Sequence, residues 1–287
     1  MIYRIQHQTR YTSVERVSVG HNEAWLTPRN TRVQNCLSHR IQIVPEPSVV
    51  VDRVDYFHNV VTQFAFNQGY DVLDVTAHSE VEVFDPVRPT AGGPPWEEVV
   101  AAVRSHRLEA DLEAFEFTFP SPRCRYAPEF ATYGLPSFFP GRPVLDAVGD
   151  LMGRFHSDVE YDPTATTVST PVEQVFRHKR GVCQDFAHLL ISVCISLGVP
   201  ARYVSGYLRT LPPSGKPRLV GADASHAWVS VYCGPLGWID IDPTNNQFPG
   251  SDYVTIAWGR DYTDGAPLKG VYIGGSSLQM QVSVDVA

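Results

Sequence analysis

The stretch that decides the fold is RGVCQDFAHLLISVCISLGVP, residues 180–200. Its apolar residues recur at helical spacing and also occupy the other sides, which predicts a buried helix that begins near Cys183 and ends near Leu197. Glycines flank this helix and Pro200 follows it. Cys183 therefore lies in the first turn, where unpaired backbone N–H groups and the helix dipole favour a thiolate over a thiol. Considered alone, a cysteine in such a helix is more commonly a buried packing residue.

Two later segments supply partners for a cysteine nucleophile. His226 opens the strand-like segment HAWVSVY, 43 positions after Cys183 (226 minus 183), and Asp242 ends the next strand, 16 positions later (242 minus 226). Cysteine catalysis needs a base that holds the thiolate as an ion pair, and an acceptor that fixes the imidazole tautomer. Alone, a histidine at a strand start is often a surface residue, and an aspartate before proline often forms a turn. Their joint occurrence in this order indicates a nucleophile, a base and an orienting acid.

Other polar and aromatic residues near these three have ordinary interpretations. Asp240 is a rival for the orienting role, because residues two apart in a strand share a face. Asp185 lies about 200° round the helix from Cys183, so we expect it to face away and to interact with the helix N-terminus. His188 is expected at the surface or just behind the site. Trp228 either lines the cleft or, more commonly for a large aromatic residue in a strand, packs in the core.

Composition limits the class of partner. Lys+Arg 23 against Asp+Glu 31 gives a net charge of −8, which argues against a nucleic acid or an anionic membrane as the main partner. The start MIYRIQHQTRYTSVERV has no signal-peptide pattern, so a cytoplasmic protein is expected. Five cysteines without a CxxC pair suggest neither a disulfide framework nor a zinc site. His226 with Asp242 lacks a closely spaced third ligand, and no metal or cofactor is expected.

The pattern of elements changes along the chain. The first segment alternates apolar and polar residues and reads as a run of strands. Pro and Gly concentrate in DPVRPTAGGPPW, residues 85–96, which indicates a boundary between a β-rich domain, 1–90, and a second domain, 91–287. Helical spacing then precedes strand-like alternation, which predicts an α+β fold. The expected helices are 96–115, 142–161 and one that begins with Thr170 as N-cap, and the expected strands are 201–210, 225–234, 236–242 and 276–287.

Three blocks carry a resemblance to a known family: GVCQDFAHLLISVCISLGVPARYVSGY, SHAWVSVY and GWIDIDPTNN. They resemble the core of the transglutaminase-like superfamily of cysteine proteases and acyl transferases. The N-terminal stretch YRIQHQTRYTSVERVSVGHNEAWLTPR and the tail TIAWGRDYTDGAPLKGVYIGG resemble the bacterial branch with a β-rich N-terminal region. The resemblance implies a papain-like core of helices on an antiparallel sheet. It also implies that Cys183 is the nucleophile, His226 the general base and acid, and Asp242 the orienting acid.

The resulting expectation is a cysteine-dependent amide-bond hydrolase that acts through an acyl-thioester on Cys183. The substrate would be a peptide, a protein or an amide-containing small molecule, and the oligomeric state is left open. Two alternatives are acyl transfer to an amine and a non-catalytic protein-binding module. Hydrolysis is favoured because the loop at residues 211–224, LPPSGKPRLVGADA, has few large apolar side chains with which to keep water out of the cleft.

Overall fold

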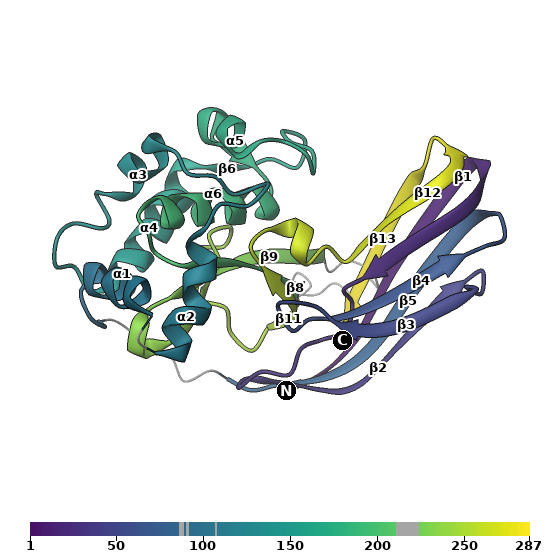
Figure 1. The fold of residues 1–287 in the computed structure, drawn as a ribbon, viewed down its shortest axis with the longest axis horizontal. Coiled ribbons are helices and arrows are strands. Elements are labelled where there is room, and N and C mark those ends of the chain that lie inside the picture. The colour runs from purple at the N-terminus through teal and green to yellow at the C-terminus, as the bar shows by residue number, and fades with distance from the viewer. Residues whose placement is uncertain (86–88, 90–91, 107, 211–223) are drawn as a thin grey trace, which may run out of the picture.

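A seven-stranded sheet built on one long strand, β1 (Ile2–Ala24), forms one end of the molecule in this computed structural model (Figure 1). The structure describes residues 1–85, 89, 92–106, 108–210 and 224–287. Along one edge of β1 lie β5 (Tyr70–Val83) and β4 (Val60–Phe66), end to end and antiparallel to it. Outside these lie β2 (Gln34–Val44) and β3 (Val49–Val54).

The last residues of the chain complete this N-terminal sheet. The strands β12 (Leu268–Ser276) and β13 (Gln279–Val286) pair antiparallel with the other edge of β1. The sequence-based division placed these residues with the domain 91–287. Their strand pairing instead joins them to the first 24 residues, because the edge of β1 supplies the backbone partners that they need.

The middle of the chain contains the helices and a second sheet. Its elements in order are α1 (Trp96–Ser105), α2 (Glu109–Phe115), η1 (Glu116–Thr118), α3 (Pro128–Gly134), α4 (Val144–Asp158), β6 (Glu160–Tyr161), α5 (Val172–His178), β7 (Arg180–Gly181), α6 (Cys183–Ser196), β8 (Ala201–Leu208), β9 (Ala224–Tyr232), η2 (Gly234–Leu236), β10 (Trp238–Ile241), β11 (Tyr253–Gly259) and η3 (Tyr262–Asp264). The second sheet has the antiparallel order β10-β9-β8-β11. The predicted α+β architecture is confirmed.

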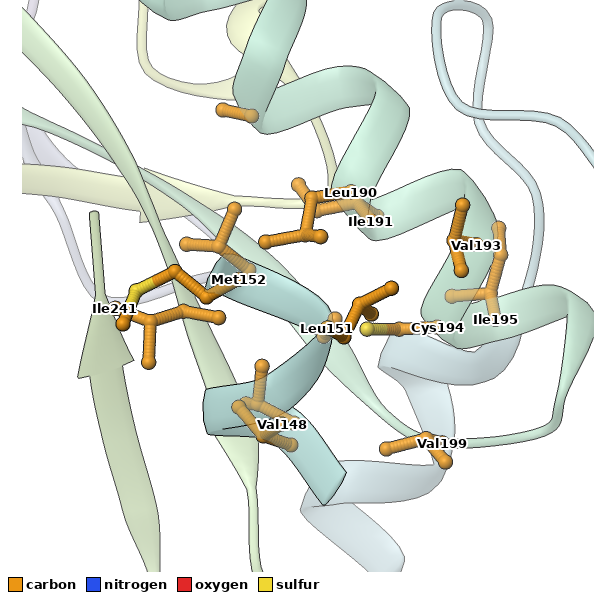
Figure 2. Close-up of a cluster of buried hydrophobic side chains, with 14 of the residues drawn as sticks. Val148, Leu151, Met152, Leu190, Ile191, Val193, Cys194, Ile195, Val199 and Ile241 are labelled. Carbon is orange, nitrogen blue, oxygen red and sulfur yellow. The ribbon is translucent and has the colours of Figure 1, made fainter. Parts of the chain in front are cut away.

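The helix predicted from residues 180–200 is α6, and it is buried as expected. It packs against β8 and β9 on one side and against α3 and α4 on others. Figure 2 shows side chains of this core: Val148, Leu151 and Met152 from α4, Leu190, Ile191, Val193, Cys194 and Ile195 from α6, and Val199 and Ile241. Each large apolar side chain that is fully buried contributes about 1.5–3 kcal/mol relative to exposure, so this contact fixes α6 against the sheet.

Smaller expectations are confirmed or corrected. Helices occupy residues 144–158 and, in place of one helix over 96–115, residues 96–105 and 109–115 separately. Strands occupy 201–208 and 238–241, within the predicted ranges. Thr170 is not the N-cap of α5, because its Oγ1 accepts a hydrogen bond from the backbone of Thr167 in the preceding turn and Pro171 takes the cap position. The strands β11 and β12 were not predicted. None of the helices among the described residues is long and apolar enough to cross a membrane.

A shared core joins the two sheets. Its buried members are Tyr3, Ile5, Val81, Val83, Tyr207, Val254, Ile256, Val284 and Val286. Beside them, Nδ1 of His7 lies 2.9 Å from the hydroxyl of Tyr207, and Nε2 of His7 lies 3.1 Å from Oγ1 of Thr9. Burial lowers the pKa of His7 to about 4, so this histidine is neutral at pH 7. The N-terminal sheet is therefore packed directly on β8 and β11.

Candidate active site

The first turn of α6 places Cys183. The helix begins there because the carboxylate of Asp185 accepts hydrogen bonds from the backbone N–H of Val182 at 2.9 Å and from Oγ1 of Thr166 at 2.6 Å. Burial raises the pKa of Asp185. Gly181 is required at the approach, because a Cβ there would lie 2.7 Å from Oδ2 of Asp185. Asp185 thus interacts with the helix N-terminus, as the sequence predicted.

The strands β9 and β10 bring His226 and Asp242 to Cys183. Nε2 of His226 lies 2.8 Å from Oδ2 of Asp242, and Cys183 lies close enough to the same imidazole to raise its pKa. The side chain of His226 is 9% exposed and that of Asp242 is 0% exposed. Burial alone would lower the pKa of His226, but the hydrogen bonds and charges of Asp242 and Cys183 raise it to about 9. The imidazole is therefore predominantly protonated at neutral pH.

Asp242 is held by more donors than the sequence analysis identified. Its Oδ2 also accepts from the hydroxyl of Tyr253 at 2.6 Å and from Nδ2 of Asn245 at 2.7 Å. Its Oδ1 accepts from the backbone N–H groups of Thr244, at 2.9 Å, and of Asn245. Burial would raise the pKa of Asp242, but hydrogen bonds from His226, Tyr253 and Asn245 outweigh it and lower the pKa. The carboxylate is ionised and fixed in orientation.

The rival carboxylate, Asp240, has a different partner. Its Oδ2 accepts from the indole N–H of Trp228 at 3.2 Å, whereas Asp242 contacts the imidazole of His226. Trp228 is 0% exposed and lies stacked beside His226, with ring centroids 6.1 Å apart. Gly206 makes room for that indole, because a Cβ there would lie 2.5 Å from its Cη2 atom. Trp228 is thus a core residue that supports the histidine.

Of the two positions expected for His188, at the surface or just behind the site, the structure excludes the surface, because His188 is buried. It is 5% exposed, and its Nε2 accepts a hydrogen bond from the backbone N–H of Tyr262 at 3.1 Å. Burial lowers its pKa to about 4, in keeping with a neutral ring that accepts at Nε2. The reason is that α6 is covered on this side by η3, a short helix that the sequence analysis did not identify.

Two tyrosines lie near the sulfur of Cys183. Burial raises the pKa values of Tyr161 and Tyr203, and the nearby charge of Cys183 raises both further. Tyr161 comes from β6, which pairs with β7 just before α6, and it is 54% exposed. Tyr203 comes from β8 and is buried. Among the residues that the structure describes, no group of three or more His, Cys, Asp or Glu side chains is arranged to hold a metal ion.

Comparison with known proteins assigns the chain to a family. The family model of the transglutaminase-like superfamily matches residues 140–243, and that of the bacterial transglutaminase-like N-terminal region matches residues 3–82. An uncharacterised protein of Mycobacterium tuberculosis is 38% identical over 293 residues, which cover 99% of this chain and 92% of the relative. The chain belongs to the transglutaminase-like superfamily. The resemblance stated from the sequence is confirmed.

Other proteins resemble the chain over its whole length or over part of it. The crystal structure of a candidate cysteine protease from Cytophaga hutchinsonii matches with a TM-score of 0.75 at 22% identity, covering 99% of this chain and 90% of that one. This likeness shows the fold. A protein-glutamine gamma-glutamyltransferase of Pseudomonas aeruginosa is 34% identical over 106 residues, which are 36% of this chain and 16% of the relative.

Proposed function

We propose that this protein is a cysteine-dependent hydrolase of amide bonds, with Cys183 as nucleophile, His226 as general base and acid, and Asp242 as orienting acid. One observation carries the proposal: His226 is hydrogen-bonded to Asp242, and Cys183, at a helix N-terminus, lies close enough to the same imidazole to raise its pKa. A protonated imidazole beside a cysteine in that position suits a thiolate–imidazolium pair.

The reaction follows from this pair. The thiolate of Cys183 attacks the amide carbonyl, and the tetrahedral oxyanion receives a hydrogen bond from the backbone N–H of Cys183. His226 gives its proton to the leaving amine as the C–N bond breaks, which leaves an acyl-thioester and a neutral imidazole. That imidazole then takes a proton from water, which attacks the thioester and releases a carboxylic acid and the thiolate. Asp242 stabilises the imidazolium without being protonated.

Hydrolysis is preferred to transfer on the composition of the loop before His226. Of that loop, residues 211–223 lie outside the described part of the chain, so the preference rests on its Pro, Gly and polar residues alone. Acyl transfer from a glutamine side chain to an amine is the second candidate. It is supported by the similarity of part of the chain to the Pseudomonas enzyme. The substrate class in both cases is a peptide, a protein or an amide-containing small molecule.

The test has two parts. A library of peptides and small amides is incubated with the protein, and mass spectrometry identifies the acyl adduct trapped on Cys183. For a substrate found in this way, we expect Cys183→Ala and His226→Ala to abolish turnover, and Asp242→Asn to retain some of it. Cys36→Ala is the matched control, because Cys36 is a partly exposed cysteine in the N-terminal sheet, and it should keep full activity. Turnover that survives Cys183→Ala would contradict the proposal.

The fate of the acyl-enzyme is measured with the same substrate and increasing concentrations of a primary amine. Free acid as the main product at millimolar amine supports hydrolysis. Dominant amide product with suppressed acid would instead establish transfer. A folded protein that binds ligands but neither forms an adduct nor turns over would support the non-catalytic binding module.

A further inference from the structure

Two side-chain amides bind the outer edge of β11, which is the last strand in the order β10-β9-β8-β11. Gln34 accepts a hydrogen bond from the backbone N–H of Thr255 through Oε1 and donates to its carbonyl through Nε2, both at 2.8 Å. Asn59 repeats this arrangement with Trp258, accepting at 3.0 Å and donating at 2.8 Å. Each amide thus makes the pair of hydrogen bonds that a residue of a neighbouring strand would make.

An irregularity in β11 allows both contacts. In a regular antiparallel strand, backbone groups that face one edge recur at every second residue. Thr255 and Trp258 are three apart, so in a regular strand they would face opposite edges. The register of β11 against β8 shifts between Thr255 and Ala257, and this bulge turns both residues toward the N-terminal region. The two amides therefore match the bulged form of the strand.

Both amides are held in one orientation. Gln34 is 2% exposed, and its Nε2 also donates to the carbonyl of Arg29 at 2.7 Å. Asn59 is 0% exposed, and its Nδ2 also donates to Asp55 at 2.9 Å. Buried amides with every such contact satisfied have no alternative arrangement of low energy. They come from β2 and from the turn before β4, 221 and 199 positions from their partners. Figure 1 shows β8, β9 and β11 between the helices and the N-terminal sheet.

The strand β11 also contributes to the candidate active site. Tyr253, two residues before Thr255, donates its hydroxyl to Oδ2 of Asp242 at 2.6 Å and accepts from Nε2 of Gln247 at 2.6 Å. We propose that Gln34 and Asn59 are positioning residues of the active site, which hold β11 where Tyr253 reaches Asp242. The inference rests on the proposed function in treating Asp242 as the orienting acid.

A measurable consequence follows for His226. The titratable groups that act on it are Asp242, just after β10, and Cys183 from α6, and the rings of Trp228 from β9 and Tyr253 from β11 lie beside it. Oδ2 of Asp242 shares its charge between His226, Asn245 and Tyr253. If the hydroxyl of Tyr253 no longer donates to this oxygen, the carboxylate interacts more strongly with the imidazolium, so the pKa of His226 rises. A residue that only stabilised the fold would not change this pKa in a folded protein.

The experiment is an NMR titration of the full chain labelled with ¹⁵N-histidine, in a Cys183→Ala background that removes the thiol. His226→Gln identifies the signal of His226. Gln34→Met keeps the length of the side chain and removes the amide, and Gln42→Met is the matched control from the exposed side of the same strand. We expect Gln34→Met and Tyr253→Phe each to raise the pKa of His226 by about half a unit to one unit.

The double variant decides whether the amide acts through the tyrosine. Gln34→Met combined with Tyr253→Phe should raise the pKa of His226 no further than the larger single change, because the two act on one contact. Asn59→Leu should raise it in the same direction, and Gln42→Met should leave it unchanged. An unchanged pKa in folded Gln34→Met or in Tyr253→Phe overturns the inference, as do additive effects.

The readout separates this inference from the proposed function. If Gln34→Met does not fold, Gln34→Glu replaces it, because its carboxylate still accepts from Thr255 and loses only the donor, and the same criteria apply. The pKa of His226 is measured without turnover. Failure of the proposed function would appear as activity that persists in Cys183→Ala, whereas failure of the positioning role would appear only in the titration.

Discussion

The contact between His226 and Asp242 predicts a stability that depends on pH in a defined window. The pKa of His226 in the folded protein is about 9, against an ordinary value of 6.5, a difference of 2.5 units. At about 1.4 kcal/mol per unit, this corresponds to about 3 kcal/mol of unfolding free energy. Because the folded pKa is raised, the contribution is fully present below pH 6.5 and is lost as the pH rises through about 9.

Asp242→Asn removes most of this contribution, because the carboxylate supplies the strongest contact that raises the pKa of His226 while Cys183 remains. Urea unfolding under reducing conditions, from pH 6 to about 9.5, measures it. We expect the difference in unfolding free energy between the parent protein and the variant to be about 2–3 kcal/mol larger at pH 6 than at pH 9.5. The turn contacts that Asp242 makes to Thr244 and Asn245 add a loss that does not vary with pH.

Asp240→Asn is the matched control for that measurement. This variant changes a carboxylate two residues away that accepts a hydrogen bond from Trp228. The difference in unfolding free energy between this variant and the parent should therefore not vary over the same pH range. A difference in unfolding free energy between the parent and Asp242→Asn that stays constant from pH 6 to pH 9.5 would refute the reasoning. So would a larger pH dependence in Asp240→Asn, which would transfer the role to Asp240.

Three further predictions test other contacts. Iodoacetamide near pH 6 should modify Cys183 first, because it lies at a helix N-terminus and interacts with His226, whereas burial raises the pKa of Cys194 to about 12; peptide mapping that finds another cysteine modified first contradicts this. His7 has a pKa of about 4 in the fold, so in urea unfolding the parent should lose up to about 3 kcal/mol more unfolding free energy than His7→Gln as the pH falls from 6.5 toward 4, because both proteins keep the contribution of His188. Gly206→Ala places a Cβ 2.1 Å from a backbone carbonyl and should cost about 2 kcal/mol or more, which an unchanged thermal midpoint would exclude.

The three proposed catalytic residues could be located from the sequence because each stands at the end of an element with a local signature. Cys183 opens an apolar helix flanked by glycines, His226 lies at the start of an alternating segment, and Asp242 precedes a proline turn. Such signals need only the residues within a few positions. The choice between Asp242 and Asp240 could not be made in this way, since both lie on one short stretch and only the three-dimensional arrangement distinguishes their partners.

The residues that hold Asp242 and β11 in position could not be found from the sequence, for a physical reason. Tyr253 reaches Asp242 only because β11 pairs with β8 in one register and carries a bulge. Gln34 and Asn59 face that bulge from the other end of the chain. No periodicity within a short window encodes a contact between residues about 200 positions apart. Asn245 is the exception, because it follows Asp242 within the same turn.

The pairing of the chain ends argues that the N-terminal region is an integral part of this fold. A cut near residue 90 would leave β12 and β13 without β1, their partner along almost their whole length. It would also expose Tyr207, Val254 and Ile256, which pack on the N-terminal sheet, and Tyr207 would lose His7. Exposed apolar side chains and unpaired strand edges both destabilise the remaining part. Residues 91–287 therefore do not have the contacts of an independent unit. The strand β11, which carries Tyr253, borders the surface that the loss of the N-terminal sheet would expose.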